Sequence, residues 1–150
     1  MVTMQQTISP PSVKGDHLCL QIPALPAQVG QARRAVVDFL RYQGWPALDT
    51  DAVALAIGEA GSNAICYGRH EDAASVVSII CTLLSPVCLQ VEVRNQGTDF
   101  RPNLDDLCCL PDDNATHGRG FALMQCLMDD MKVFQDGQET VVQLTKSRTL

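Results

Sequence analysis

ALAIGEAGSNAICYG, residues 54–68, is an almost wholly apolar stretch that carries one carboxylate, Glu59, and one amide, Asn63. On a helix, residues four apart lie on the same face, one turn above the other. Burying either polar group without a partner is costly. The stretch therefore predicts a buried helix, capped by Asp49 or Thr50, whose two polar groups serve a ligand, a metal ion or a polar core network. Taken alone, such a pair is more typical of a solvated or internally paired helix face.

Hydrophobic periodicity predicts the elements on either side of this helix. Alternating apolar and polar residues indicate strands, and apolar residues three and four apart indicate helices. In chain order we predict a strand at 17–22 ended by Pro23, a helix at 27–43, the helix above, strands at 75–84 and 87–94 joined by Ser85-Pro86, a long loop at 95–117, a helix from 118–120 to Met131, and a hairpin of 132–135 and 140–145 turning at Asp136-Gly137. This order predicts an α/β (α+β) fold, a two-layer sandwich of a mixed, mainly antiparallel sheet with helices on one face.

Length and composition indicate a single domain. The chain has 150 residues, of which 46% are hydrophobic and 19% charged, a balance that supports a folded core. Residues 1–15 lack the basic and apolar segments of a secretory signal, and we expect them to form a flexible N-terminal tail. One domain is expected at 16–147.

Charge and cysteine content narrow the partners and the compartment. A formal net charge of -6 argues against nucleic acid as a partner. No stretch approaches the roughly 20 apolar residues of a membrane-spanning helix, so no membrane partner is expected. The seven cysteines lack paired metal-ligand spacing, which predicts free core thiols in a reducing cytoplasm rather than disulfides or a zinc site.

Two further segments carry groups suited to a nucleotide. Gly118-Arg119-Gly120 stands at a predicted helix start, where unpaired amides and the helix dipole favour an anion and glycine lets phosphate approach the backbone. Asn95-Gln96-Gly97 ends an alternating strand, where a polar side chain before a glycine bend could read the edge of a base. Each segment alone also fits an ordinary turn.

Four segments of the chain together carry a family resemblance: ALAIGEAGSNAICYG, VEVRNQGTDFRP, THGRGFALMQCLMDDMKV and ETVVQLTK. Their order and spacing resemble the GHKL ATPase superfamily, and within it the small anti-sigma-factor serine-protein kinases of bacteria, which have a histidine-kinase-like ATPase domain. The resemblance spans about residues 16–146. It implies the Bergerat-type ATPase fold, ATP or ADP with Mg²⁺ as cofactors, and a homodimer as one possible assembly.

The resemblance also implies roles for individual residues. Glu59 would be the catalytic base or water-orienting group, and Asn63 would ligate the Mg²⁺ that bridges the phosphates. Asn95 would occupy the place of the family's adenine-reading Asp. The other nucleotide contacts implied are Gly97 beneath the base, Gly118, Arg119 and Gly120 at the phosphates, and Thr140 near the adenine, with a lid at about 102–117.

The chain departs from the family pattern Asp-x-Gly-x-Gly, since residues 95–99 read Asn-Gln-Gly-Thr-Asp. Replacing the carboxylate with the Asn95 amide exchanges a charged hydrogen bond for a neutral one, a loss of about 1–2 kcal/mol in nucleotide binding. Because an amide can rotate to exchange donor and acceptor, we hypothesise relaxed discrimination between ATP and GTP. Asp99 adds a negative charge near the phosphates if the loop folds inward, and Tyr67 stands where close relatives often carry His.

The resemblance predicts an ATP-dependent, Mg-requiring serine/threonine-protein kinase that also acts as an anti-sigma factor. Its substrate would be a STAS-domain anti-anti-sigma protein, and a sigma factor or other regulator would compete as partner in a partner-switching pathway. The alternative is a catalytically weak or inactive GHKL-fold module that sequesters a sigma factor or other regulator, which Asn95 and Asp99 favour. A histidine-kinase fragment is disfavoured because residues 1–50 contain one substantial predicted helix and no phospho-accepting dimer domain.

Overall fold

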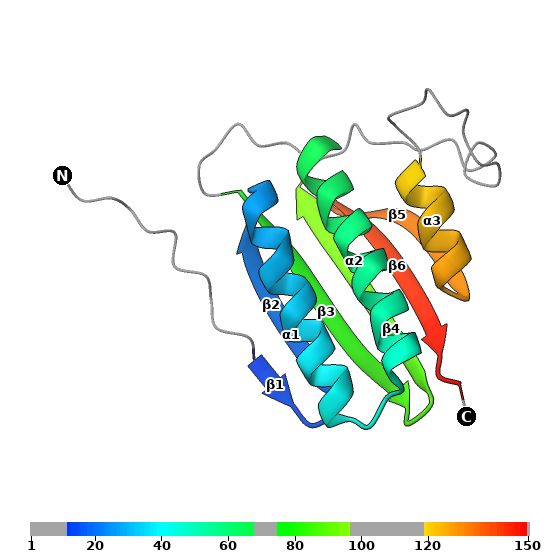
Figure 1. Ribbon diagram of the computed structural model, residues 1–150. Coiled ribbons are helices and arrows are strands. Elements are labelled where there is room, and N and C mark those ends of the chain that lie inside the picture. The colour runs from blue at the N-terminus through cyan, green and yellow to red at the C-terminus, as the bar shows by residue number, and fades with distance from the viewer. Residues whose placement is uncertain (1–11, 68–74, 97–118, 150) are drawn as a thin grey trace.

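The computed structural model describes residues 12–67, 75–96 and 119–149, which form two layers (Figure 1). One layer is a sheet whose strands are β1 (Ser12–Lys14), β2 (His17–Pro23), β3 (Val76–Ser85), β4 (Cys88–Gln96), β5 (Asp130–Asp136) and β6 (Glu139–Ser147). The other layer contains α1 (Val29–Tyr42), which follows the short 3-10 helix η1 (Pro26–Gln28), α2 (Ala47–Tyr67) and α3 (Arg119–Leu127). The helices lie on one face of the sheet, as the sequence predicts.

The described strands pair in the order β1-β2-β3-β4-β6-β5, and each of these pairings is antiparallel. Tight hairpins join β3 to β4 and β5 to β6, and Gly137 adopts a φ of 62° in the second of these turns. The last strand, β6, lies beside β4 inside the sheet rather than at its edge. The C-terminal hairpin therefore reaches the middle of the domain, next to the end of β4.

The short strand β1 differs from the sequence prediction, which places its residues in the tail at 1–15. Ser12 pairs with Cys19 and Lys14 pairs with His17, so β1 extends the sheet at the edge of β2. Three residues are too few to show a hydrophobic period, and backbone pairing alone defines this strand. Residues 1–11 of the predicted tail lie outside the described residues.

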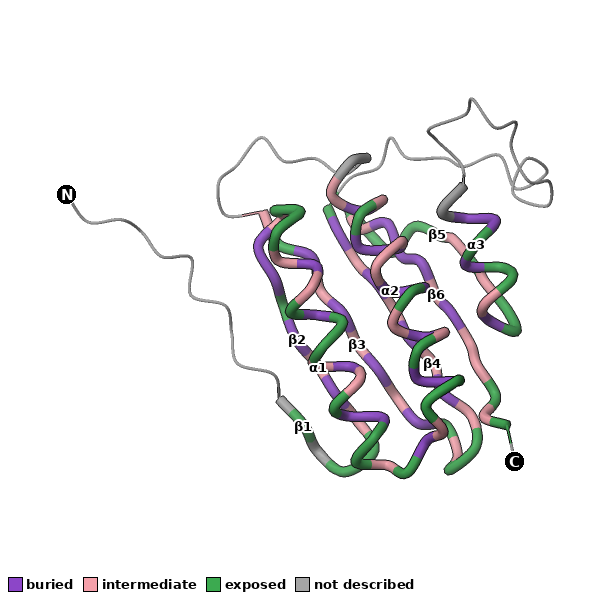
Figure 2. Tube along the Cα trace, viewed as in Figure 1, coloured by how far each residue is buried: buried purple, intermediate pink, exposed green. Residues whose placement is uncertain are grey.

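The hydrophobic core lies between the helices and the sheet. Alternate residues of β3 and β4 are buried, so one face of each strand packs under the helices (Figure 2). The central helix, α2, buries small and branched side chains along the face toward the sheet, namely Val53, Ala56, Ile57 and Ala60, all at 0% exposure. Because this face is filled by apolar side chains, the polar groups of α2 lie at its sides and its ends.

The start of α2 differs from the prediction. The helix begins at Ala47, so Asp49 and Thr50 lie inside its first turn instead of capping it. Thr50 Oγ1 donates to the carbonyl oxygen of Pro46 at 3.0 Å. The Asp49 carboxylate accepts hydrogen bonds from the backbone N–H and hydroxyl of Thr149, at 2.8 and 3.0 Å. Asp49 therefore ties the far end of the chain to α2, a partner that local sequence does not reveal.

The end of α3 also differs from the prediction. The helix ends at Leu127, whereas the apolar spacing extends to Met131. Met131 instead belongs to β5 and pairs with Leu144 of β6. Its position suits the core in either conformation, and only the pairing of the two strands decides between them.

Candidate functional site

Glu59 and Asn63 lie on the C-terminal half of α2, one turn apart as predicted, and both side chains are partly buried. The amide nitrogen of Asn63, Nδ2, is buried and has no hydrogen-bond acceptor in the described part of the chain. A buried donor without an acceptor costs about 1–3 kcal/mol. The amide nitrogen of Asn63 thus lacks an acceptor within the described residues, on the same helix face as a carboxylate.

Four other described side chains also have a buried polar atom without a partner: Gln28, Trp45, Arg94 and Arg148. Asn63 differs from them in its position. Glu59 precedes it by one turn, and its neighbour in the chain, Ala64, is hydrogen-bonded to the buried residue Asn95. Asn63 is thus one turn from a carboxylate and next in the chain to a residue that β4 contacts through Asn95.

The end of β4 brings Asn95 against the C-terminal part of α2. Asn95 is 6% exposed, and its Nδ2 donates to the carbonyl oxygen of Ala64 at 3.3 Å. The same nitrogen lies 3.3 Å from the carbonyl oxygen of Gln96. This bond fixes the end of β4 relative to α2, across 31 residues of sequence.

Thr140 lies directly opposite Asn95 in the pairing of β4 with β6. Thr140 is 3% exposed, and its hydroxyl accepts a hydrogen bond from Nε2 of Gln135 on β5 at 2.6 Å. Four of the predicted site residues are thus connected: Asn95 and Thr140 are paired in the sheet, and Asn95 is bonded to the C-terminal half of α2, which carries Glu59 and Asn63. Figure 1 shows the end of β4 beside this end of α2.

The hydrogen bonds of Asn95 determine which way its amide faces. Both partners are carbonyl oxygens, so the nitrogen must point toward them, because a reversed amide would set oxygen against oxygen. Oδ1 is then left as an acceptor. This arrangement opposes the free rotation on which the hypothesis of relaxed ATP/GTP discrimination rests. A carboxylate at this position could not donate to Ala64 at all.

The other predicted nucleotide contacts are described in part or not at all. Arg119 and Gly120 begin α3, which is where the sequence predicts a helix start. Phe121 and Met124 anchor this helix in the core at 3% and 0% exposure. Gly97, Asp99, Gly118 and the predicted lid at 102–117 lie outside the described residues, and the side chains of Arg119 and Tyr67 are not described.

No group of three or more His, Cys, Asp or Glu side chains in the described residues could hold a metal ion. A magnesium site of the kind implied by the resemblance does not require one. Mg²⁺ typically takes one or two protein oxygens and fills its other positions with water and phosphate oxygens. The amide oxygen of Asn63, on the same face as Glu59, suits such an ion.

The described cysteines are free, as predicted, but only one of them is a core thiol. Cys81 is fully buried, and burial raises the pKa of its thiol to about 12. Cys19 and Cys88 are partly buried, and Cys126 is exposed. The expectation of core thiols is therefore wrong for Cys126, which stands on the outer face of α3.

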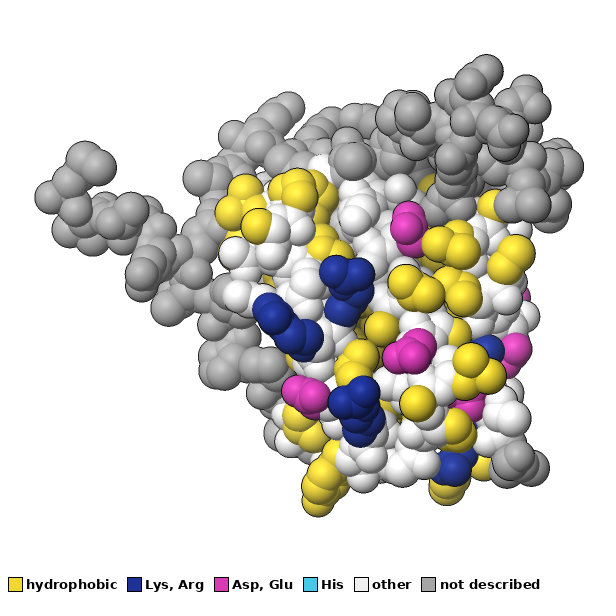
Figure 3. All heavy atoms as spheres, in the orientation of Figure 1, with side chains coloured by type: hydrophobic (Ala, Val, Ile, Leu, Met, Phe, Trp, Pro, Cys, Tyr) yellow, Lys and Arg dark blue, Asp and Glu magenta, His cyan; other side chains and the backbone are white. Residues whose placement is uncertain are grey.

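The charge on the helix face is unevenly distributed. Figure 3 shows Lys and Arg side chains gathered over α1, which carries the exposed residues Arg33, Arg34 and Arg41. Gly58 on α2 gives one of them room, since a Cβ atom at Gly58 would lie 3.1 Å from Cδ of Arg33. The chain is acidic as a whole, with a net charge of -6, yet α1 presents a positive surface.

Sequence reasoning missed two groups that hold the site together. The Ala64 carbonyl is invisible in a sequence, because any residue would supply it. Gln135 left a weak signal, since a two-residue turn after Asp136 sets Gln135 opposite Thr140. Only the strand pairing shows that their side chains meet.

The two-layer fold and the family match together place the chain in a class of ATPase domain. Residues 22–146 match the family described as the histidine kinase-like ATPase domain, and the chain belongs to this family. Membership in it implies nucleotide binding.

Similar proteins indicate which members of this family the chain resembles. The serine-protein kinase RsbW of Bacillus velezensis is 29% identical over 142 residues, covering 90% of this chain and 88% of the relative. The anti-sigma F factor of Clostridium acetobutylicum is 30% identical over 123 residues, covering 79% of this chain and 85% of the relative. The chain is thus similar to two kinds of small regulatory protein along most of their lengths.

Solved structures support the fold. The RsbU and RsbW domains of a Mycobacterium tuberculosis protein match 88% of this chain and 32% of theirs, with a TM-score of 0.67 and 16% identity. A histidine kinase domain from Erythrobacter litoralis matches 84% of this chain and 61% of its own, with a TM-score of 0.52 and 19% identity. Among the described helices, none has the length and apolarity needed to span a membrane.

Proposed function

We propose that this chain is an ATP-dependent serine/threonine-protein kinase and anti-sigma factor that phosphorylates a STAS-domain anti-anti-sigma protein. The observation that carries the proposal is the pair Glu59 and Asn63, one turn apart on the part of α2 to which Asn95 of β4 is hydrogen-bonded, with the Asn63 amide nitrogen lacking an acceptor among the described residues. The serine-protein kinase and anti-sigma F factor among the similar proteins support it.

The catalytic step assigns a separate task to each residue. Asn63 would hold Mg²⁺ through Oδ1, and the bound ion supplies charge neutralisation for the phosphates. Glu59 accepts the proton of the substrate serine as that oxygen bonds to the γ-phosphorus. The bond between this phosphorus and the bridging oxygen breaks, and ADP leaves. Glu59 is partly exposed, which leaves room for the hydroxyl.

Asn95 and Thr140 would select the base. With its nitrogen held by Ala64, Asn95 presents Oδ1, which can accept a hydrogen bond from the 6-amino group of adenine. Guanine carries an oxygen at this position, and two acceptors repel. The proposal therefore includes preference for ATP over GTP, in place of the relaxed discrimination suggested by sequence.

Phosphorylation would then switch partners. A phosphate adds a charge of about -1.5 to -2 at neutral pH. On the STAS protein it would be formed next to Glu59, in a chain whose net charge is -6, and repulsion would favour release. The released chain could bind a sigma factor.

A homodimer is part of the proposal, and light scattering tests it.

The direct test is phosphoryl transfer. The purified chain, Mg-ATP and a STAS protein encoded beside it are mixed, and the STAS protein is weighed by mass spectrometry. We expect the mass of one phosphate to be added, and we expect Glu59→Gln to slow transfer about 10²- to 10⁴-fold. Ser62→Ala, an exposed residue of the same helix, is the control and should transfer normally. Transfer by Glu59→Gln at the normal rate would overturn the catalytic assignment.

The second candidate is a binding module without catalysis. The neutral amide of Asn95, in the place of the family carboxylate and bonded to Ala64, favours it. Under this alternative no phosphate is transferred, and Glu59→Gln and Asn63→Ala leave binding of a STAS protein or a sigma factor unchanged. The transfer assay separates the candidates, because the kinase adds a phosphate to the STAS protein and loses this activity in both variants, whereas the module adds none.

A further inference from the structure

Apolar side chains are exposed beside Glu59 on the outer surface of two neighbouring helices. Leu55 precedes Glu59 by one turn of α2, on the same helix face, and is 50% exposed. On α3, which packs against α2, Leu123 is 38% exposed. Figure 3 shows hydrophobic side chains gathered over α3 and the adjoining part of α2. The surface next to the proposed catalytic carboxylate is therefore apolar.

The fold does not use these two leucines. Other residues of the same helices fill the core, for example Ile57 and Met124, both at 0% exposure, and neither Leu55 nor Leu123 belongs to the core cluster. Exposed apolar residues scattered singly need no explanation, whereas an apolar surface bordered by charged residues is typical of contacts with other molecules. This surface is bordered on α2 by Glu59 and by the exposed residue Asp51.

The spacing along α2 indicates which molecule covers the surface. Leu55 and Glu59 are four residues apart, which on a helix corresponds to a rise of about 6 Å. An extended segment covers about 6–7 Å in two residues. A protein segment that brings a hydroxyl group to Glu59 therefore has another side chain within reach of Leu55. Glu59 is itself partly exposed, so the hydroxyl and its neighbours approach from the solvent side of the helix.

From this arrangement we propose that Leu55 and Leu123 form a docking surface for the protein substrate of Glu59. The inference rests on the proposed function. The substrate carries an apolar side chain about two residues from its phospho-accepting serine, and this side chain is buried against the two leucines. Burial away from the reacting atoms then holds the serine hydroxyl in position at Glu59.

The kinetics of phosphoryl transfer test the docking surface. With the STAS protein encoded beside this chain as substrate, Leu55→Gln should raise its KM about tenfold, the effect expected when a half-exposed leucine loses its apolar contact. The kcat should be retained, because the contact is the same in the ground state and the transition state. Leu123→Gln should act in the same direction. Leu55→Met keeps an apolar side chain and should keep the KM.

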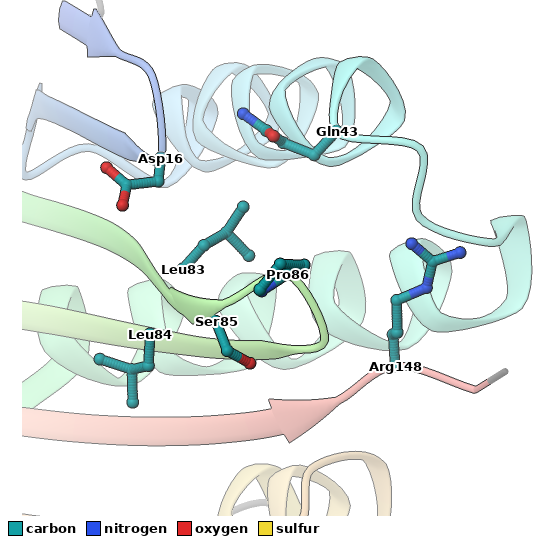
Figure 4. Close-up of a pocket in the computed structure, with 7 residues that line it drawn as sticks. All are labelled: Asp16, Gln43, Leu83, Leu84, Ser85, Pro86 and Arg148. Carbon is teal, nitrogen blue, oxygen red and sulfur yellow. The ribbon is translucent and has the colours of Figure 1, made fainter.

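A matched control is available at the other end of the sheet. Leu84 is 58% exposed and lies at the β3–β4 turn (Figure 4), whereas Asn95 lies at the opposite end of the same strand pair. Leu84→Gln should leave the KM unchanged. Urea denaturation shows whether each variant is folded. Calorimetric titration of the STAS protein in the presence of Mg-ADP measures docking without transfer, and Leu55→Gln should weaken this binding about tenfold.

The outcomes separate this inference from the proposed function. If the unmodified chain transfers phosphate and Leu55→Gln keeps both KM and affinity, the docking surface is wrong and the kinase stands. If the unmodified chain transfers no phosphate but Leu55→Gln still binds the STAS protein more weakly, the surface stands and the catalytic claim fails. Absence of any binding of the STAS protein would overturn the inference. So would loss of a homodimer in Leu55→Gln, seen by light scattering, with unchanged affinity for the STAS protein, because a second copy would then cover the surface.

Discussion

The two halves of α2 each hold a polar side chain in the interior, and the two are treated differently. Asp49, in the first turn, is 3% exposed, and its carboxylate accepts two hydrogen bonds from Thr149. Asn63, near the other end, has a buried amide nitrogen with no acceptor in the described residues. The Asp49 carboxylate is hydrogen-bonded within the fold, whereas the amide nitrogen of Asn63 lacks a hydrogen-bond acceptor among the described residues.

This difference predicts a structural role for Asp49 and a ligand-binding role for Asn63. A satisfied buried carboxylate contributes to stability, and its removal exposes its former partners to a desolvation cost. An unsatisfied amide contributes nothing to stability and is retained at a cost, which is expected where a ligand completes its bonding. The contrast predicts that changes at the two ends of α2 affect different measurements.

The largest expected effect is on stability, at Asp49. Asp49→Ala removes two hydrogen bonds to a charged group and leaves the N–H of Thr149 without its acceptor. We expect the free energy of unfolding to fall by about 2–4 kcal/mol, measured by urea denaturation. Asp51→Ala, an exposed neighbour, should change it by less than about 0.5 kcal/mol. Equal losses of stability in the two variants would contradict the structural role of the Asp49 hydrogen bonds.

The next effect is on ligand binding, at Asn63. Asn63→Ala should weaken Mg-nucleotide about 10- to 100-fold, the loss typical of a disturbed metal site. Its free energy of unfolding should stay the same or rise, because the buried donor without an acceptor is gone. Calorimetric titration and urea denaturation measure the two quantities on the same sample. A clear loss of stability with unchanged nucleotide affinity would show that Asn63 is structural.

A smaller effect is expected at Asn95, where both roles meet. Asn95→Asp cannot donate to Ala64, and we expect the free energy of unfolding to fall by about 1–2 kcal/mol. The matched control is Gln96→Glu, which adds the same charge at the exposed neighbour. Similar urea midpoints for the two variants would mean that the bond to Ala64 does not hold β4 to α2.

The smallest effect on stability is expected for a surface ion pair, Arg94 with Asp136. Arg94 donates to Asp136 at 2.7 Å, and this hydrogen bond raises the pKa of Arg94 above its ordinary value. The side chain of Asp136 is 59% exposed, however, and water screens the pair. Asp136→Asn should cost less than about 1 kcal/mol, and the cost should shrink as salt is added. If Asp136→Asn lowered the free energy of unfolding more than Asn95→Asp does, the expectation that buried hydrogen bonds contribute more than exposed ion pairs would be contradicted.

Much of the fold could be predicted because its elements are local patterns. The alternation in β4 and the apolar face of α1 give both their type and their place in the two layers. The sequence could not show that Met131 belongs to a strand, because its apolar side chain suits the core either way. Nor could it show β1, which backbone pairing alone defines.

The site could be predicted less completely, because its contacts join distant residues. The spacing of Glu59 and Asn63 depends only on helix geometry, and the structure confirms that they share a face. The orientation of the Asn95 amide depends on a backbone carbonyl 31 residues away, so the sequence suggested a rotation that the structure opposes. The partner of Asp49, Thr149, likewise becomes visible only when the chain has folded.

The account is tested most directly by the unfolding temperature of the full chain with ADP, with and without Mg²⁺. A nucleotide at a hundred times its dissociation constant should stabilise the fold by about 2.7 kcal/mol, so the unfolding temperature should rise clearly when Mg²⁺ is present and much less with a chelator. Ser62→Ala should show the same rise, and Asn63→Ala should lose most of it. Identical unfolding temperatures under all conditions, or an undiminished rise in Asn63→Ala, would contradict the account.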